Sequence, residues 1–306
     1  MNTGIGKYIK VIGRGKDGAR ALTREQASDL FAQVLDRAVT DLEIGAFCLA
    51  MRIKGETPQE MAGFLDATAA RLHKIPMQGR TAVVLPSYNG ARKLPVLTPL
   101  LALLLAREGL PVLVHGTATE AGRVTAQNVL LALNVPAQTA IETIANGSVH
   151  FVPTGLLCPG LLALLEVRRL VGLRNPAHSL VKLMNPCDGP ALVVGSYTHA
   201  EYALSMAATL QLVQATALLL RGTEGEPVAD PRRTPAMDAV ADGRLTRVQE
   251  AQGGSLASVP GLPAPDATST VSWIQAVLDG QEPVPPPIAL QVAHIVRIIG
   301  QTRKTA

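Results

Sequence analysis

Five short apolar runs, each close to turn residues and separated from the next by a helical stretch, constrain the fold of this chain most. They lie at 83–85, 112–115, 151–153, 191–194 and 217–220. Short apolar strands that alternate with helices are typical of βαβ units, in which a helix connects two parallel strands. The chain after about residue 81 is therefore expected to form a largely parallel sheet with flanking helices.

The first seventy or so residues instead have apolar side chains at helical spacing. Thr23 with Gln26 has the spacing of a capping box at a helix start, and Thr57 is expected to cap a further helix that has Pro58 at its first position. Other helices are expected at 41–53, with Asp41 as the N-cap, and at 98–107, 161–183, 269–278 and 288–299. The predicted fold class is α/β, with a small all-helical domain and a larger α/β domain whose sheet is mainly parallel.

Composition narrows the class of protein. The 306 residues are 47% hydrophobic and 17% charged, which indicates a sizeable core and excludes disorder over most of the chain. Aromatic residues make up only 3%, so extensive base-stacking surfaces are excluded. The cysteines 48, 158 and 187 form no CxxC pair, which argues against a zinc site and fits a reducing cytoplasm. The longest apolar run, 94–106, is shorter than the roughly 20 residues that cross a bilayer, and no secretory signal is evident. We expect a cytoplasmic protein without a membrane segment.

The net charge of +4 is concentrated near the N-terminus. Residues 1–20 hold Lys7, Lys10, Arg14, Lys16 and Arg20 against a single acidic residue, Asp17, and the remainder of the chain is neutral overall. Lys7 and Lys10 are three positions apart and share a helix face. Such a cluster attracts phosphate polymers, which release counterions on binding. A solvated helix end that serves solubility alone remains the alternative.

Residues 82–93, AVVLPSYNGARK, combine a buried strand, a tight turn and the approach to a helix. This geometry presents backbone N–H groups to an anion. The candidate anion or phosphate site consists of Ser87, Asn89 and Gly90, together with His115 and Gly116 after the next strand. With one glycine and the bulky Tyr88 in the turn, a snug diphosphate cradle is not expected. Packing of His115 in the core is the alternative to anion contact.

Two blocks of the chain closely resemble the anthranilate phosphoribosyltransferases of glycosyltransferase family 3. Residues 43–67, EIGAFCLAMRIKGETPQEMAGFLDA, resemble the helical domain of that family. Residues 168–186, RRLVGLRNPAHSLVKLMNP, resemble its R-R-x-L-G-x-R-T-x-F-N-x-x-G-P-L-x-N-P block. The resemblance implies a small helical dimerisation domain from 1–75 with 166–186, and a large α/β domain from 76–165 with 187–306.

The chain departs from that family where the family binds its substrate. The family's G-T-G-G-D is P-S-Y-N-G at 86–90, and its K-H-G-N-R is V-H-G-T-A at 114–118. The family's adjacent Asp-Glu pair, which holds magnesium, corresponds to a position near residues 221–226, RGTEGE, of this chain. Here Glu224 and Glu226 alternate, so they would point in opposite directions along an extended chain. Magnesium on a diphosphate needs carboxylates that converge. We therefore expect no catalytic residues, metal or cofactor; magnesium and phosphoribosyl diphosphate are expected only if transferase activity persists.

One subgroup, the YbiB-type proteins, resembles the chain in these same departures. The shared motifs are IGRGK at 12–16, PSYNGARK at 86–93, VHG at 114–116, RNPAHSLVKL at 174–183 and RGTEGE at 221–226. Proteins of this subgroup are DNA-binding homodimers without sequence preference. The resemblance implies that function here, with DNA as partner. An active phosphoribosyltransferase with an altered substrate remains the alternative.

Basic residues at four places could follow nucleic-acid phosphates. The candidates are Lys7, Lys10, Arg14, Lys16, Arg92, Lys93, Arg168, Arg174, His178 and Lys182. Arg174, His178 and Lys182 are four positions apart, which predicts a stripe on one helix face, although His178 could instead be buried. Arg221, Arg232 and Arg233 form a weaker cluster. Arg92 and Lys93 could alternatively pair with a carboxylate, and a symmetric dimer would double each patch.

Overall fold

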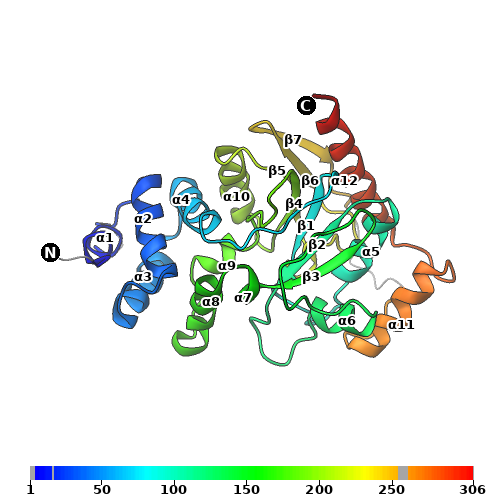
Figure 1. The fold of residues 1–306 in the computed structure, drawn as a ribbon, viewed down its shortest axis with the longest axis horizontal. Coiled ribbons are helices and arrows are strands. Elements are labelled where there is room, and N and C mark those ends of the chain that lie inside the picture. Colours follow the sequence, from blue (N-terminus) through cyan, green and yellow to red (C-terminus); the bar gives the residue numbers. More distant parts are fainter. Residues whose placement is uncertain (1–3, 16, 254–260, 306) are drawn as a thin grey trace. The chain divides into compact units, whose positions relative to one another are not determined.

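The chain divides into two compact units in the computed structural model, which describes residues 4–15, 17–253 and 261–305. One unit comprises residues 1–73 with 154–186, and the other comprises 74–153 with 187–306 (Figure 1). The predicted fold class is confirmed, because the first unit is helical and the second carries a mostly parallel sheet. The second stretch of the helical unit begins at residue 154, earlier than the expected 166. Lys16, a predicted nucleic-acid-binding residue, lies outside the described residues.

The helical unit is built on capped helices around an aromatic core. Its helices are α1 (Gly6–Ile12), α2 (Arg24–Leu35), α3 (Asp41–Lys54), α4 (Pro58–Ala69), α7 (Thr154–Leu157), α8 (Pro159–Val171) and α9 (Ala177–Leu180). The capping box at Thr23 is formed as predicted, and Thr57 is the predicted N-cap of α4, where Glu60 closes a second box. Asp41 is the first helical residue of α3 rather than its N-cap, because Thr40 accepts from the Glu43 backbone N–H and closes a further box. The core contains Phe31, Phe47 and Phe64 in mutual ring contact.

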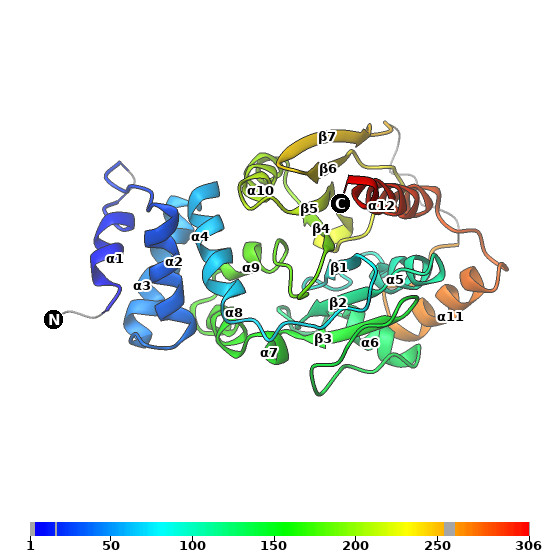
Figure 2. The ribbon, with the colours of Figure 1, turned by 45° about the horizontal axis from the view of Figure 1, so that its top comes forward.

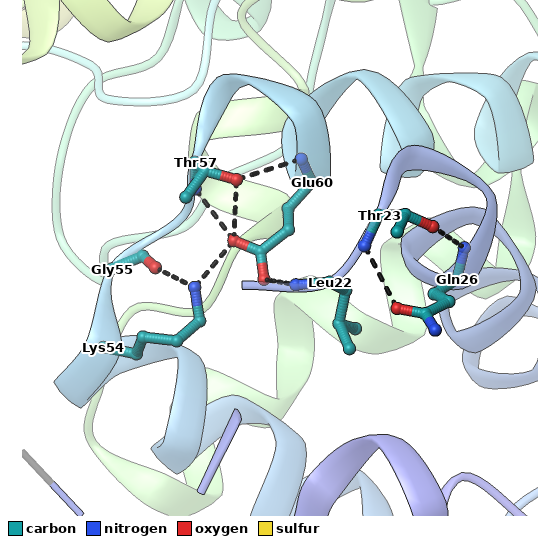
Figure 3. Close-up of polar contacts among 7 residues, drawn as sticks. All are labelled: Leu22, Thr23, Gln26, Lys54, Gly55, Thr57 and Glu60. Atoms are coloured by element: carbon teal, nitrogen blue, oxygen red, sulfur yellow. Dashed lines mark hydrogen bonds and ion pairs between the residues drawn. The ribbon is translucent and has the colours of Figure 1, made fainter. Parts of the chain in front are cut away.

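A buried carboxylate joins three parts of this unit (Figure 3). Glu60 is fully buried, and its Oε1 accepts from the Leu22 backbone N–H at 3.0 Å. Its Oε2 accepts from Lys54 Nζ at 2.6 Å and from the Thr57 backbone N–H at 2.9 Å. Lys54 also donates to the Gly55 carbonyl at 2.7 Å. The IKGET segment at 53–57 and Glu60 are therefore structural: they fasten the turn between α3 and α4 to the chain that enters α2.

The prediction of one helix over 161–183 is wrong. Helix α8 ends at Gly172, which adopts the left-handed conformation with φ of 75°, and only the short α9 follows. A glycine in this conformation is a common helix C-cap, and a proline soon after it, here Pro176, disfavours continuation. Arg174 therefore precedes α9, and Lys182 follows it.

The α/β unit contains a seven-stranded sheet in the order β3-β2-β1-β4-β5-β6-β7. The strands are β1 (Ala82–Pro86), β2 (Val112–Gly116), β3 (Val149–Pro153), β4 (Ala191–Tyr197), β5 (Thr216–Arg221), β6 (Met237–Ala241) and β7 (Arg244–Gln249). The five strands that the apolar runs predicted are parallel, whereas β6 and β7 add an antiparallel hairpin that was not predicted. Strand β7 is polar and largely exposed, so it lacks the apolar signal of the others.

Helices cover both faces of this sheet (Figure 2). The main core lies between one face and the helices α5 (Thr98–Arg107), α6 (Ala126–Ala132), α11 (Ala267–Leu278) and α12 (Pro286–Thr305). Helix α10 (Glu201–Leu212) packs on β4 to β7, and the strands lie between it and α12 in both views. The connections run outward from β1 on one side and from β4 on the other. The boundary between β1 and β4 is thus a topological switch point, where α/β sheets bind ligands at the carboxyl ends of strands.

No helix in the described parts of the chain is long and apolar enough to cross a membrane. The three cysteines are buried, and no disulfide joins them.

Candidate functional site

The loop after β1 is packed tightly against its neighbours. Residues 87–90 are buried, and Gly90 has φ of +68°. A Cβ on Gly90 would lie 2.7 Å from the Val124 carbonyl oxygen, and one on Gly116 would lie 1.8 Å from that of Ser87. Since real Cβ atoms do not approach so closely, both glycines are required for the loop to reach its position.

The carboxylate of Glu226 occupies the centre of this loop. Its Oε1 accepts from the backbone N–H groups of Asn89 at 2.8 Å and Gly90 at 2.9 Å. Its Oε2 accepts from the Thr98 hydroxyl at 2.9 Å and from the Ser87 hydroxyl. Glu226 is only 2% exposed. Four donors therefore converge on one buried anion, and that anion belongs to the chain itself.

Glu224 makes the same kind of contact with the next part of the loop. Its carboxylate accepts from the backbone N–H groups of Arg92 at 2.6 Å and Lys93 at 2.9 Å. The expectation that Glu224 and Glu226 point in opposite directions is wrong, because both carboxylates accept from residues 87–93. The segment is not extended: Glu224 has φ of 53° and Gly225 has φ of 88°, within the 3₁₀ turn η1 (Thr223–Gly225).

These contacts change the interpretation of the predicted anion site. Asn89 and Gly90 do present backbone N–H groups to an anion, as strand–turn–helix geometry predicts. Those groups already donate to Glu226, so an external phosphate would have to displace a buried carboxylate. Phosphate binding at Ser87, Asn89 and Gly90 stays a prediction, and a phosphate there would have to compete with the Glu226 carboxylate.

The magnesium site of the transferases does not fit the residues present. Both carboxylates near 221–226 accept hydrogen bonds from N–H or O–H donors, which satisfies the oxygens that a cation would use. Among the described residues, no three His, Cys, Asp or Glu side chains are placed to hold a metal ion together.

The His115 side chain is packed in the core of the α/β unit. Its side chain is fully buried, and burial lowers the pKa of its imidazole from 6.5 to about 3. Its Nδ1 lies 2.8 Å from the Tyr88 hydroxyl, and the two rings meet edge to face with centroids 5.6 Å apart. A neutral, enclosed imidazole does not offer positive charge to a ligand.

A cavity of about 760 Å³ lies at the carboxyl ends of β4 and β5, beside the loop. Its wall contains the basic side chains Lys93, Arg221, Arg232 and Arg233 and the acidic side chains Glu224 and Asp230. Arg232 donates to both oxygens of Asp230, at 2.9 and 2.8 Å. Burial opposes ionisation of Asp230, but these bonds prevail and lower its pKa. The sequence indicated Arg221, Arg232 and Arg233 only as a weak cluster, and Lys93 separately, because no local pattern indicates that these residues share a cavity.

The other predicted cations differ in accessibility. Lys10 on α1 and Arg14 after it are exposed, as are Arg92 and Lys93. Lys7 is exposed but lies 3.7 Å from Asp29 and over the Tyr8 ring.

The predicted stripe of Arg174, His178 and Lys182 is not formed. Arg174 is exposed in a loop, His178 is half-buried near Asn175, and Lys182 is only 9% exposed. Arg168, on α8, is half-buried. Helix α9 spans only Ala177–Leu180, so Arg174 and Lys182 lie outside it and the three residues do not share a helix face.

The chain is similar to known proteins in both sequence and structure. Residues 7–71 match the helical bundle domain of the glycosyl transferase family. The structure is similar to anthranilate phosphoribosyltransferase from Thermus thermophilus, with a TM-score of 0.73 and 20% identity over 93% of this chain and 85% of that one. It is also similar to the Saccharomyces cerevisiae enzyme in complex with PRPP and Mg, with a TM-score of 0.72 and 12% identity over 97% and 88% of the two chains. The protein has the fold of the anthranilate phosphoribosyltransferases.

A closer relationship exists within that class. The chain is 39% identical to YbiB, an uncharacterized protein of Escherichia coli strain K12, over 96% of this chain and 94% of YbiB. It therefore belongs to the same family as YbiB.

Proposed function

We propose that this protein binds nucleic acid, namely DNA without sequence preference, as a homodimer, and that it uses neither phosphoribosyl diphosphate nor magnesium. The observation that carries the proposal is the occupation of the loop after β1 by Glu226 and Glu224. A diphosphate bound at this loop would need the same N–H groups as donors. Because these N–H groups already donate to Glu226 and Glu224, phosphates would instead bind at the surface, where Arg92 and Lys93 are exposed.

Charge repulsion adds to this competition. Two like unit charges 4 Å apart repel by about 4 kcal/mol at an effective dielectric constant of about 20. A diphosphate beside Glu226 would meet that repulsion and would also lose the four donors that Glu226 holds. Both the charge repulsion and the loss of hydrogen-bond donors therefore disfavour diphosphate binding at the loop.

The exposed cations suit a polymer of phosphates. Glu224 fixes the backbone of Arg92 and Lys93, while both side chains remain exposed and form no ion pair within the described residues. Lys10 and Arg14 are likewise exposed and unpaired in that part of the helical unit. Contacts to phosphates carry no sequence information, and scarce aromatic residues leave little surface for base stacking. Both features support binding without sequence preference.

An exposed apolar face supports the homodimer. Leu42, Leu49 and Ile53 are 83%, 46% and 67% exposed, and their spacing places them on one face of α3. Leu170, on α8 of the same unit, is 90% exposed. Large apolar side chains exposed on a helix face are typical of protein interfaces. A dimer through the helical unit would cover them.

Charge reversal tests the proposal. The double variant Arg92→Glu with Lys93→Glu should weaken binding to duplexes of every sequence and lower the salt dependence by about one unit of log–log slope per lost phosphate contact. Arg244→Glu is the matched control, because Arg244 is exposed at the opposite end of the sheet, where β7 begins. A loss confined to one DNA sequence, or an equal loss in the control, contradicts the proposal. Release of diphosphate from phosphoribosyl diphosphate with magnesium would instead establish the transferase alternative.

A further inference from the structure

We propose that the cavity at the carboxyl ends of β4 and β5 binds a phosphate monoester, as carried by a nucleotide or by the phosphorylated end of a nucleic-acid strand. The proposal goes beyond surface binding of DNA, since internal DNA phosphates are diesters with one charge each. It depends on the Arg221 cavity, defined here as the 760 Å³ cavity whose wall contains Lys93, Arg221, Arg232 and Arg233.

The position of the cavity is that of a ligand site. Tyr197 and Arg221 are register partners at the ends of the parallel strands β4 and β5, and both line the cavity. The adjoining ligand position, over the end of β1, is filled by Glu226. At this edge of the sheet, a ligand therefore finds room not over β1 but over the ends of β4 and β5, where the cavity wall is basic.

The charge of the wall favours an anion. Four basic side chains face two carboxylates, and each carboxylate already has its own donors. Asp230 is bound by Arg232, and Glu224 accepts from backbone N–H groups. Neither Lys93 nor Arg221 forms an ion pair with any described residue, and Arg233 likewise has no direct carboxylate contact there. The cavity therefore has an excess of two positive charges, held by side chains that are free to turn towards a ligand.

The chemistry of these groups selects a phosphate monoester. At pH 7 a monoester carries between about −1.5 and −2 charges, which the excess positive charge matches. Planar guanidinium groups such as those of Arg221 and Arg233 bind two phosphate oxygens at once. The volume lies within the range of about 300–1,000 Å³ that small-molecule sites have, so it accommodates more than the phosphate alone. The hydroxyls of Tyr197 and Thr198 line the same wall and supply polar contacts to the attached group.

Calorimetric titration with adenosine 5′-monophosphate and with adenosine tests the proposal. The nucleotide should bind and adenosine should bind at least tenfold more weakly, with the same result in the presence of EDTA, since protein side chains supply the positive charge. Arg221→Gln and Arg233→Gln should each weaken nucleotide binding about tenfold or more. Both side chains are at least partly exposed, so the variants are expected to fold. Arg244→Gln should bind like the parent protein.

Two further arms separate the sources of the phosphate. A single-stranded oligonucleotide with a 5′-phosphate should compete with the nucleotide better than the same oligonucleotide with a 5′-hydroxyl if strand ends are the ligand; equal competition assigns the site to free nucleotides. Equal binding of nucleotide and adenosine, or unchanged binding in Arg221→Gln and Arg233→Gln, overturns the proposal. Failure of random duplex binding alongside nucleotide binding would refute the proposed function and leave this site standing.

Discussion

Replacement of Glu226 should destabilise the α/β unit strongly. Glu226→Ala leaves the backbone N–H groups of Asn89 and Gly90 buried without an acceptor, at about 1–3 kcal/mol each. The hydroxyls of Ser87 and Thr98 can turn to other acceptors and add less. We therefore expect a loss of about 4 kcal/mol in the free energy of unfolding. Glu226→Gln keeps one oxygen for the two N–H groups and removes a buried charge, so it should lose only about 1–2 kcal/mol.

Urea unfolding followed by tryptophan fluorescence measures this loss in the relevant unit. The single tryptophan, Trp273, lies on α11 of the α/β unit and reports its unfolding. Glu142→Gln is the matched control, because Glu142 is an exposed residue of the same unit. Its effect should stay within about 0.5 kcal/mol.

Added anions then separate the role of Glu226 from a general packing defect. Inorganic phosphate or diphosphate can enter the vacated position and supply acceptors to the four donors. It should raise the urea midpoint of Glu226→Ala by mass action and leave that of the parent protein nearly unchanged. An unfolding midpoint of Glu226→Ala equal to that of the control would refute the reasoning. So would an equal effect of phosphate on both proteins.

Three other substitutions test the structural roles assigned above. His115 titrates near 3 when folded and near 6.5 when unfolded, so the unfolded chain binds the extra proton; stability should fall as pH drops from 6.5 towards 3, and His115→Asn should flatten this part of the pH profile of the Trp273 midpoint. Glu60→Ala should cost the helical unit about 3–5 kcal/mol, because it leaves Lys54 without its buried partner; protection of α2 to α4 amides from hydrogen exchange should fall, and unchanged protection would contradict this role. Gly116→Ala should destabilise the α/β unit by at least about 2 kcal/mol, since its Cβ would lie 1.8 Å from the Ser87 carbonyl oxygen; a urea midpoint equal to that of the parent would show that the loop can move aside.

The sequence predicted those parts of the fold that depend on local patterns. Strands β1 to β5 follow from apolar runs bounded by turn residues, and α2 and α4 follow from their N-cap residues Thr23 and Thr57. The hairpin of β6 and β7 was missed because β7, RLTRVQ, is mostly polar and lies at an exposed edge of the sheet. The break after α8 was missed although Gly172 and Pro176 were visible, and the spacing of Arg174, His178 and Lys182 after it was interpreted as one helix face.

The site was predicted only in part, because its residues are far apart in the sequence. The local sequence indicated an anion-binding loop after β1, and the structure places an anion there. Which anion it is depends on contacts between residues 139 positions apart, Ser87 and Glu226, and no local pattern contains that information. Arg221, at the end of β5, and Lys93, in the loop after β1, share a cavity for the same reason: only the sheet order places β1 and β5 on either side of β4.

The salt dependence of duplex binding tests the central claim most directly. Fluorescence anisotropy of a labelled random-sequence duplex, titrated with the unmodified protein between about 50 and 200 mM salt, gives the slope of log affinity against log salt concentration. Binding that involves several phosphates should give a slope of about −0.9 per phosphate neutralised, equal for unrelated sequences. A slope near zero, or no binding at the lowest salt concentration, would contradict the account.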